Sequence, residues 1–317
     1  MNTYITIDGG TTNTRLTLVR GGRITDRIAF TGGAGAGDDG RERLKESIRN
    51  AIGTLLERNA LHEGDIRRIL ASGMITSEYG LCCLDHIEAP AGLEELHRSM
   101  YETRLDEVTG IPFTFIRGVK RSGDSPEETD VMRGEETELM GILDVGERAC
   151  AYVLPGSHSK IIKTDGQGRI CDFSTMLTGE MIYSLSQHTI LRNAVDLNVS
   201  RTDADALLEG YDYCAKAGIN QALFKTRLLK TVFQADPVVI YSYFLGVVLC
   251  GEIMQIAACG AETVVLGGKA QIKNAMAELL RKRTQKHVVV LDEETVDASV
   301  ALGAVRIFEY SAAAGEA

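Results

Sequence analysis

Residues 4–19 read YITIDGGTTNTRLTLV, and this stretch decides the fold class. Residues 4–7 and 15–19 are rich in β-branched and apolar side chains, and a Gly-Gly turn separates them, so we predict two strands of a hairpin. A second Gly-Gly pair, residues 21–22, leads into a third predicted strand, residues 23–30. The chain is therefore expected to begin with an antiparallel meander of three strands.

The first turn of this meander has the composition of a phosphate-binding loop. Glycine lets backbone N–H groups approach a phosphate closely, and the hydroxyl and amide side chains that follow add further donors. Asp8, at the end of the first strand, supplies a carboxylate for Mg²⁺. A plain hairpin also favours Gly-Gly, but it requires neither the Asp before nor the Thr-Thr-Asn after. The predicted nucleotide-binding residues of the turn are Gly9, Gly10, Thr11, Thr12 and Asn13.

The same pattern returns in the second half of the chain. Residues 149–154, 160–164 and 169–173 are predicted to form another meander, without sequence identity to the first. Its first turn again combines glycine with small hydroxyl residues, and we predict a second phosphate cradle that faces the first across a cleft. A purely structural role for the histidine of this turn stays open. The predicted nucleotide-binding residues here are Gly156, Ser157, His158 and Ser159, with Lys160 as a ligand for a phosphate or an acidic substrate.

Two further segments carry candidate chemistry. Gly267 and Gly268 end an apolar strand, where they would let adenosine lie against the backbone, although an ordinary strand-to-helix turn fits equally well. Asp130 is placed to accept a proton from a substrate hydroxyl, at the predicted start of a helix. Arg133, one turn later, suits a carboxylate or a transferring phosphoryl group. The alternative makes Asp130 a helix N-cap and places Arg133, Glu135 and Glu136 on a solvated face.

Strands and helices alternate with short links, which indicates the α/β class. A polar stretch, residues 120–128, is predicted to be a linker between two domains, residues 1–123 and 124–296, with the last segment, 297–317, packing back on the first. A glycine-rich loop is expected at residues 32–40. Helices are predicted at residues 41–59, 93–105, 130–143, 179–194, 203–217, 221–233, 238–259, 271–283 and 297–310, and further strands at residues 66–72, 112–119, 263–266 and 287–291.

Composition excludes several classes of function. The formal net charge of −10 argues against a nucleic-acid partner, because phosphate backbones require a basic face. The 7 cysteines show no zinc-site spacing, which favours free thiols in a reducing compartment. The N-terminus lacks a signal-peptide pattern, and the apolar stretch at residues 238–258 is broken by glycines and a glutamate, so a buried helix is expected there. We therefore expect a cytoplasmic protein without membrane partners; a homodimer is compatible with the sequence.

The order of these motifs resembles that of the sugar kinase/heat-shock/actin ATPase superfamily. Five segments are similar to the 2-dehydro-3-deoxygalactonokinase family in particular: DGGTTNTR (8–15), SGMI (72–75), DVMRGEET (130–137), LPGSHSK (154–160) and TGE (178–180). The resemblance implies a two-lobed actin/hexokinase-like (ribonuclease H-like) fold with the nucleotide in a cleft between the lobes. It also implies transfer of the ATP γ-phosphate to the terminal hydroxyl of 2-dehydro-3-deoxy-D-galactonate, in galactonate catabolism.

By the same resemblance, Asp130 is the catalytic base and Asp8 the metal-side carboxylate. Arg133 is the third predicted catalytic residue, and the substrate-side candidates are Arg15, Ser72, Gly73 and Lys160. For Arg15, Arg133 and Lys160 the inference comes from their charge and position, which suit the carboxylate of an acidic sugar. The chain departs from the family pattern at Gly9, where a Trp is usual, and at residues 76–79, which read TSEY where a GSRQ-type run is usual. Two alternatives therefore stay open. One is a kinase of the same fold for another small sugar acid or alcohol, and the other is a non-catalytic sensor that binds a nucleotide or sugar.

Overall fold

The computed structural model describes residues 2–32, 38–146, 149–268 and 270–311, and the chain divides into two compact units. Unit 1 comprises Met1–Arg148, Asp165–Asp172 and Glu294–Ala317, and unit 2 comprises Ala149–Thr164 and Phe173–Glu293. The boundary that we predicted after residue 123 lies instead after Arg148. The core of the predicted glycine-rich loop, residues 33–37, and the end of the C-terminal tail, residues 312–317, lie outside the described residues.

The main sheet of unit 1 has the strand order β3-β2-β1-β4-β7-β6. β1, β2 and β3 pair antiparallel, which confirms the predicted meander, whereas β4 runs parallel to β1 and β7 parallel to β4. The parallel arrangement matters for function, because it brings the carboxyl ends of β1 and β4 to the same edge of the sheet. The strands are β1 (Thr3–Gly9), β2 (Asn13–Arg20), β3 (Arg23–Thr31), β4 (Arg68–Gly73), β6 (Tyr101–Thr103) and β7 (Phe113–Phe115).

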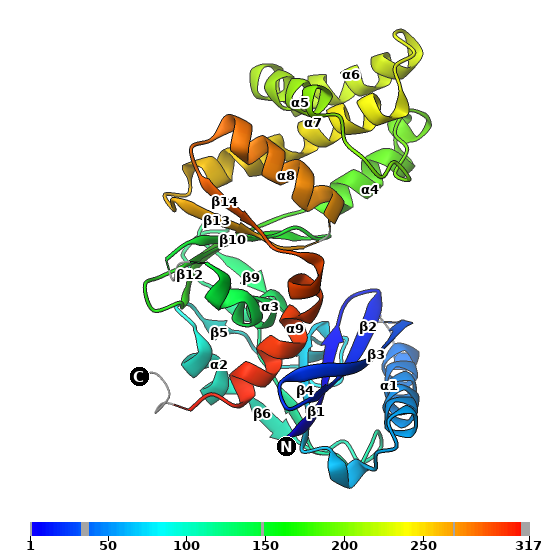
Figure 1. Cartoon of the computed structure of the whole chain (residues 1–317), viewed down its shortest axis with the longest axis vertical. Coiled ribbons are helices and arrows are strands. Elements are labelled where there is room, and N and C mark those ends of the chain that lie inside the picture. Colours follow the sequence, from blue (N-terminus) through cyan, green and yellow to red (C-terminus); the bar gives the residue numbers. More distant parts are fainter. Residues whose placement is uncertain (1, 33–37, 147–148, 269, 312–317) are drawn as a thin grey trace. The chain divides into compact units, whose positions relative to one another are not determined.

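Helix α1 (Asp38–Arg58) covers this sheet through the apolar face predicted from its spacing, with Leu44, Ile48 and Leu55 in one core with the strands. Helix α2 (Leu93–Ser99) is shorter than predicted, because the chain continues into β6. Helices α3 (Glu135–Ile142) and α9 (Glu293–Phe308) approach closely (Figure 1). Gly303 and Gly141 allow this approach, since a Cβ at either would collide with the backbone of the other helix.

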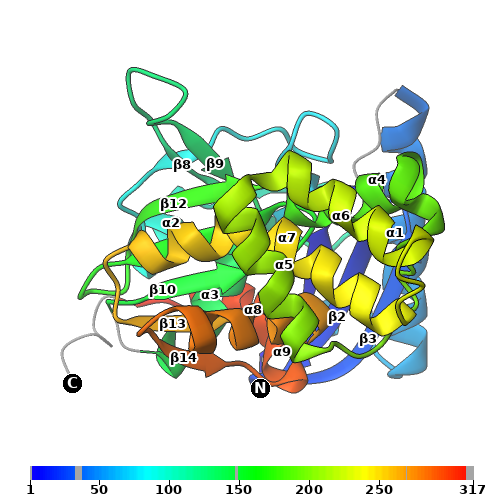
Figure 2. The same ribbon diagram turned by 90° about the horizontal axis from the view of Figure 1, so that it is seen from above.

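The polar stretch at residues 120–128 is not a linker between domains. It belongs to the hairpin between β8 (Val119–Arg121) and β9 (Asp130–Met132), which pair antiparallel in unit 1. These strands form a small sheet with β5 (Ile87–Glu88). Figure 2 shows the loop of this hairpin extending well beyond the two strands. A protruding hairpin and a linker have the same polar, turn-rich composition, and for this reason the sequence did not separate them.

The sheet of unit 2 repeats the arrangement of unit 1, with the order β12-β11-β10-β13-β14. β10 pairs antiparallel with β11 and parallel with β13, as β1 does with β2 and β4, and this confirms the predicted repeat of architecture. The strands are β10 (Ala151–Leu154), β11 (Ser159–Thr164), β12 (Ile170–Met176), β13 (Thr263–Leu266) and β14 (His287–Val290). The first residues of β12 are counted with unit 1.

Helix α7 (Pro237–Ala258) is the central helix of unit 2. Its first turn is set by Pro237 and by Asp236, whose side chain accepts a hydrogen bond from the Val238 N–H at 2.8 Å. By length and composition α7 is one helix that could cross a membrane, but 72% of its most apolar stretch is buried inside the protein, as expected for a core helix. Around it lie α4 (Thr178–His188), α5 (Ala204–Ala217), α6 (Ile219–Thr231) and α8 (Ala270–Arg283) (Figures 1 and 2).

Candidate active site

In unit 1, Asp8 stands at the end of β1 between two neighbouring strands. Its direct partners are Arg15 on β2 and Ser72 on β4, and opposed residues place their side chains on the same face. Burial raises the pKa of Asp8, the Arg15 guanidinium lowers it and Glu135 raises it. The Ser72 hydroxyl is buried and makes no hydrogen bond with the described residues. Three of the predicted site residues therefore meet at one sheet edge, together with a glutamate that we did not predict.

The turn that follows Asp8 is tight and presents its side chains to solvent. The Gly10 N–H donates to the Asn13 carbonyl at 2.9 Å, and a Cβ at Gly10 would lie 2.8 Å from the same oxygen. Thr11, Thr12 and Asn13 are exposed. The exposed side chains of the turn lie beside the Asp8 carboxylate, and the phosphate-binding role of residues 9–13 stays a prediction.

Three glycines hold this edge of unit 1 together. A Cβ at Gly73 would lie 2.6 Å from the Gly9 carbonyl oxygen, and a Cβ at Gly134 would lie 3.3 Å from the Gly73 Cα. Gly73 and Gly134 also have positive φ angles of 82° and 115°. The ends of β1 and β4 and the start of α3 are consequently in backbone contact, which brings Glu135 near Asp8. For Gly73 this is a structural role beside the substrate role predicted for it.

The first turn of α3 carries three acidic residues, Glu135, Glu136 and Glu138, of which one interpretation of the sequence placed the first two on a solvated face. Glu136 is fully buried and accepts hydrogen bonds from the Gly134 N–H at 2.7 Å and the Thr137 hydroxyl at 2.9 Å. Burial, reinforced by the charge of Glu135, raises the pKa of Glu136 to about 7. Burial together with Glu135 and Asp8 raises the pKa of Glu138 to about 8. Acidic residues are common at helix N-termini for dipole reasons, so the pattern gave no warning of a site.

We predicted that Asp130 begins a helix, and this prediction is wrong. Asp130 is the first residue of β9, opposite Arg121 on β8, and its carboxylate accepts a hydrogen bond from the Val131 N–H at 2.7 Å. α3 begins five residues later, at Glu135, after the positive φ of Gly134. The helix was predicted to start too early because pairing with β8 overrides the local preference of residues 130–132. The role of Asp130 as a base stays a prediction.

Arg133 has a different environment from the one we expected. Its guanidinium donates to the Thr76 carbonyl at 2.7 Å, the Thr76 hydroxyl at 2.6 Å and the Leu84 carbonyl at 3.0 Å, and it contacts His86 Nδ1 at 3.3 Å. Burial, with a contribution from Arg133, lowers the pKa of His86 to about 4, so this imidazole is neutral and can accept. These contacts engage most of the guanidinium donors. They indicate an anchor for the segment 76–86 rather than a catalytic cation.

In unit 2, the hairpin between β10 and β11 rests on the N-terminus of α4. The Gly179 N–H donates to the carbonyls of Gly156 at 3.1 Å and Ser157 at 3.2 Å, and the Glu180 N–H donates to Ser157 at 3.3 Å. His158 and Glu180 pair at 2.8 Å between Nε2 and Oε1. A Cβ at Gly179 would collide with the hairpin backbone, so glycine is required there. The sequence singled out both segments, and the structure brings them together.

The glycines after β13 lie against the same hairpin. Gly268 has a φ of 74°, and a Cβ on it would lie 2.5 Å from the Pro155 carbonyl oxygen. The Gly267 N–H donates to the Val153 carbonyl at 2.9 Å. The predicted phosphate turn and the predicted adenosine segment are thus neighbours within unit 2, because β13 runs parallel beside β10.

Two predicted ligand-binding side chains of this hairpin point inward. Ser159 is fully buried and its hydroxyl donates to Glu252 of α7. Lys160 is 4% exposed, and its Nζ donates to the Thr175 hydroxyl at 2.7 Å. They are consecutive residues of β11, so their side chains point to opposite faces of the sheet, and both residues are buried because both faces are covered at this position. The hydroxyl of Ser159 is therefore not available to a phosphate, and the exposed side chains of the turn are those of Ser157 and His158.

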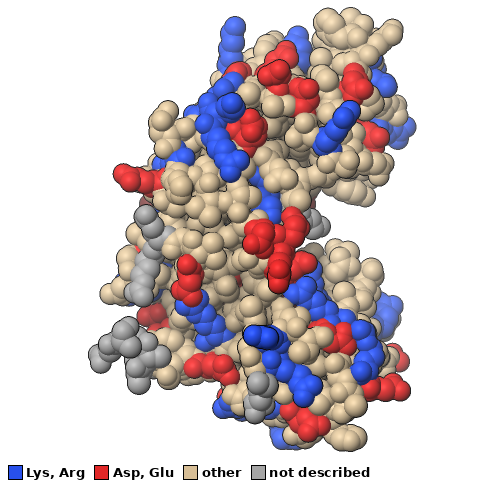
Figure 3. Space-filling view, viewed as in Figure 1, with Lys and Arg blue, Asp and Glu red and all other residues tan. Residues whose placement is uncertain are grey.

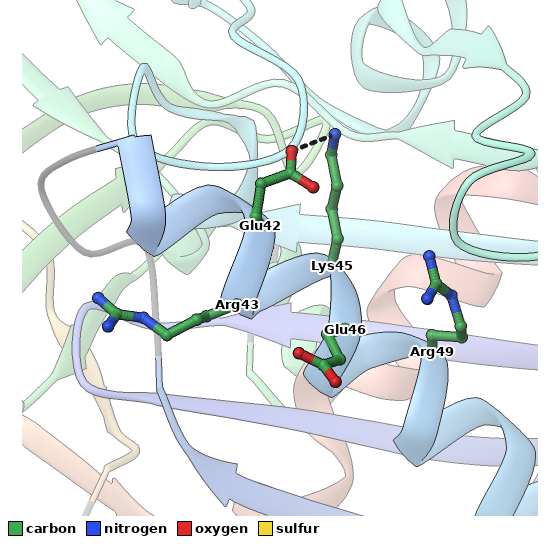
Figure 4. Close-up of a pocket in the computed structure, with 5 residues that line it drawn as sticks. All are labelled: Glu42, Arg43, Lys45, Glu46 and Arg49. Carbon is green, nitrogen blue, oxygen red and sulfur yellow. Dashed lines mark hydrogen bonds and ion pairs between the residues drawn. The ribbon is translucent and has the colours of Figure 1, made fainter.

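The pocket drawn in Figure 4 is separate from these residues. It is formed by charged side chains on the first turns of α1, including Lys45, which pairs with Glu42 at 2.9 Å. No predicted site residue lines it. Among the described residues no group of three or more His, Cys, Asp or Glu side chains is arranged to hold a metal ion, and all 7 cysteines are free thiols.

Comparison with known proteins identifies the family. The model of the 2-keto-3-deoxy-galactonokinase family matches residues 8–302. The chain belongs to this family. It is 28% identical over 209 residues to the 2-dehydro-3-deoxygalactonokinase of Escherichia coli (strain K12), a match that covers 66% of this chain and 64% of the relative. The chain thus matches slightly less than two thirds of that relative's length.

Two solved structures give the fold of this family member. A Sinorhizobium meliloti protein assigned to 2-dehydro-3-deoxygalactonokinase superimposes with a TM-score of 0.77 at 22% identity, covering 97% of this chain and 98% of that one. A Lactobacillus acidophilus xylulose kinase superimposes with a TM-score of 0.54 at 10% identity, covering 100% of this chain and 91% of that one. The expected α/β fold of the sugar-kinase type is confirmed.

Proposed function

We propose that this chain transfers the γ-phosphate of ATP to the terminal hydroxyl of 2-dehydro-3-deoxy-D-galactonate. The observation that carries the proposal is the family match over residues 8–302. The composition and exposure of two turns support it, and we propose that both bind phosphate: residues 9–13 beside Asp8 in unit 1, and Gly156 to His158 beside Gly268 in unit 2.

In the proposed reaction, a carboxylate removes the hydroxyl proton as the substrate oxygen attacks the γ-phosphorus, and ADP leaves. Asp130 is the base that the family resemblance favours. Glu135 is the second candidate, because its charge acts on Asp8. Arg15 is our candidate for the substrate carboxylate: it is exposed beside Asp8, whereas Arg133 and Lys160 use their donors within the protein.

The residues around Asp8 suit a Mg²⁺ ion that is held by one protein carboxylate and by phosphate oxygens, and not by several protein ligands. Mg²⁺ in kinases is commonly held by one or two carboxylates together with phosphate oxygens and water, and Asp8 lies beside the proposed phosphate turn without a ligand cluster among the described residues. When bound, the ion would neutralise phosphate charge. Burial raises the pKa of Asp8, and the Arg15 guanidinium counteracts this rise and so favours the ionised form that a metal ligand must have.

We further propose a cytoplasmic enzyme whose partner is a small acidic sugar rather than a nucleic acid. The name of the family is that of a kinase for a small sugar acid. The net charge of −10 does not suit a nucleic-acid partner, because phosphate backbones require a basic face. On the face drawn in Figure 3, Lys and Arg side chains are interspersed with Asp and Glu. A homodimer is compatible with the sequence, and sedimentation measurements distinguish it from a monomer.

The test is ATP- and Mg²⁺-dependent ADP release with a panel of 2-keto-3-deoxy sugar acids, other sugar acids, pantothenate and neutral sugars. We expect the highest kcat/KM with 2-dehydro-3-deoxy-D-galactonate, and little activity with neutral sugars of similar shape. Preference for another acid would favour the second kinase hypothesis. Nucleotide binding without turnover on any acceptor would favour the sensor.

A further inference from the structure

Glu252 is a buried carboxylate in the central helix of unit 2. It is 4% exposed, and its helix neighbours Leu249, Ile253 and Ile256 belong to the apolar core. A charged group in such a place carries a desolvation cost that an apolar residue of similar size would avoid. Burial raises the pKa of Glu252, while its two hydroxyl partners lower it. Packing alone therefore does not account for a glutamate at this position.

The two partners of Glu252 come from two different segments. Oε1 accepts from the Ser159 hydroxyl, and Oε2 accepts from the Thr178 hydroxyl at 2.6 Å. Ser159 follows the hairpin turn directly and begins β11, whereas Thr178 is the first residue of α4. One carboxylate thus joins the end of the hairpin to the start of the helix on which that hairpin rests.

Glu252 joins the same two segments, the hairpin and the start of α4, that backbone hydrogen bonds also connect. Directly after Thr178, the N–H groups of Gly179 and Glu180 donate to the carbonyls of Gly156 and Ser157. A shift of the hairpin or of the start of α4 would lengthen these bonds. Their donors, Gly179 and Glu180, lie one and two residues after Thr178, whose hydroxyl is held by Glu252. Correct placement of a phosphate loop to within an ångström strongly affects ligand binding and catalysis.

We propose that Glu252 is a positioning residue: through Ser159 and Thr178 it fixes the 155–158 hairpin on α4, and thereby sets the geometry with which the hairpin binds the ATP phosphates. The inference rests on the proposed function for its ligand. The juxtaposition of hairpin and helix does not depend on that function and can be measured separately.

The experiment compares Thr178→Val, Glu252→Gln and their double variant with Ser242→Ala as the control. Ser242 is also buried in α7, and its hydroxyl accepts from the Asp203 N–H at 2.8 Å, away from the hairpin. Thr178→Val keeps the side-chain shape and removes one partner. We expect the KM for ATP to rise about tenfold in either single variant, with no further rise in the double variant and an unchanged KM for the sugar acid.

Hydrogen–deuterium exchange of the whole chain gives a readout that does not require kinase activity. We expect faster exchange at Gly179, Glu180 and residues 156–159 in the Thr178 and Glu252 variants, but not in Ser242→Ala. An increase spread evenly over unit 2 would overturn the proposal, and so would unchanged exchange at these amides or an equal increase at them in Ser242→Ala. If the wild-type chain has no kinase activity, the proposed function is rejected. Faster exchange confined to these amides in the variants would then still support the positioning role.

Discussion

Asp8 and Arg15 are directly opposed residues of β1 and β2, and the charge of Arg15 counteracts the rise in the pKa of Asp8 that burial causes. Arg15 therefore favours the ionised carboxylate, the form that a Mg²⁺ ligand must have. This relationship gives Arg15 a role in the chemistry of the turn even before any contact with substrate.

Replacing Arg15 by Met is expected to raise the pKa of Asp8 further, because burial then acts without its counter-charge. The acid limb of the pH profile of kcat/KM should move to higher pH, and the KM for the sugar acid should rise roughly tenfold with the loss of a carboxylate partner. Arg20→Met, at the far end of the same strand, is the matched control. An unchanged pH profile would show that Arg15 does not act on Asp8.

Asp130→Asn and Glu135→Gln together decide which carboxylate is the base. The variant that removes the base should lower kcat by about 10²–10⁴ while ATP binding, measured by calorimetry, is retained. We expect this result for Asp130→Asn and a smaller effect for Glu135→Gln. The reverse order would transfer the role to Glu135 at the start of α3, and full activity in both would exclude either residue.

Replacing Arg133 by Met is expected to destabilise the protein rather than to slow the chemistry selectively. It leaves the carbonyls of Thr76 and Leu84 without their donors, which should lower the free energy of unfolding by about 2–4 kcal/mol in urea titrations. Arg98→Met, which breaks only an exposed pair with Glu94, should change it by less than about 0.5 kcal/mol. A stable Arg133 variant with strongly reduced kcat would restore the catalytic role predicted from sequence.

Glu136 predicts a specific dependence of stability on pH. Its pKa in the folded chain is about 7, above the ordinary value of 4.5, so between these values the folded state holds a proton that the unfolded state has lost. The contribution of this group to stability is present below pH 4.5 and falls as the pH rises to about 7. Glu136→Gln should remove this decline, which amounts to up to about 3 kcal/mol. Unfolding measured at pH 5 and pH 8 checks it, and parallel curves for both proteins would contradict the buried charge.

Gly179→Ala introduces a methyl group where the hairpin backbone already lies. The hairpin must move away from α4, and we expect the KM for ATP to rise about tenfold or more. Gly251→Ala is the matched control, because a Cβ there meets nothing within 4 Å and α7 gains helix propensity. Equal ATP binding in both variants would mean that the docked hairpin does not contribute to nucleotide affinity.

The sequence by itself determined the two meanders, the α/β class and the family. These rest on short-range patterns: alternating apolar strands, Gly-Gly turns and helical spacing, each of which has a local physical cause. The motifs at residues 8–15, 130–137 and 154–160 were sufficient to indicate the kinase family, which the match over residues 8–302 then established.

Only the tertiary structure decided which side chains within each unit can reach a ligand. We placed Asp130 on a helix because its pairing with Arg121 depends on a neighbouring strand. The inward orientation of Ser159 could not be predicted, because its partner Glu252 lies 93 residues away in sequence. The glutamates of α3 gained their raised pKa values from burial beside Asp8, on a strand more than a hundred residues earlier. Such contacts leave no local pattern, since their energy depends on residues that meet only after the sheet has formed.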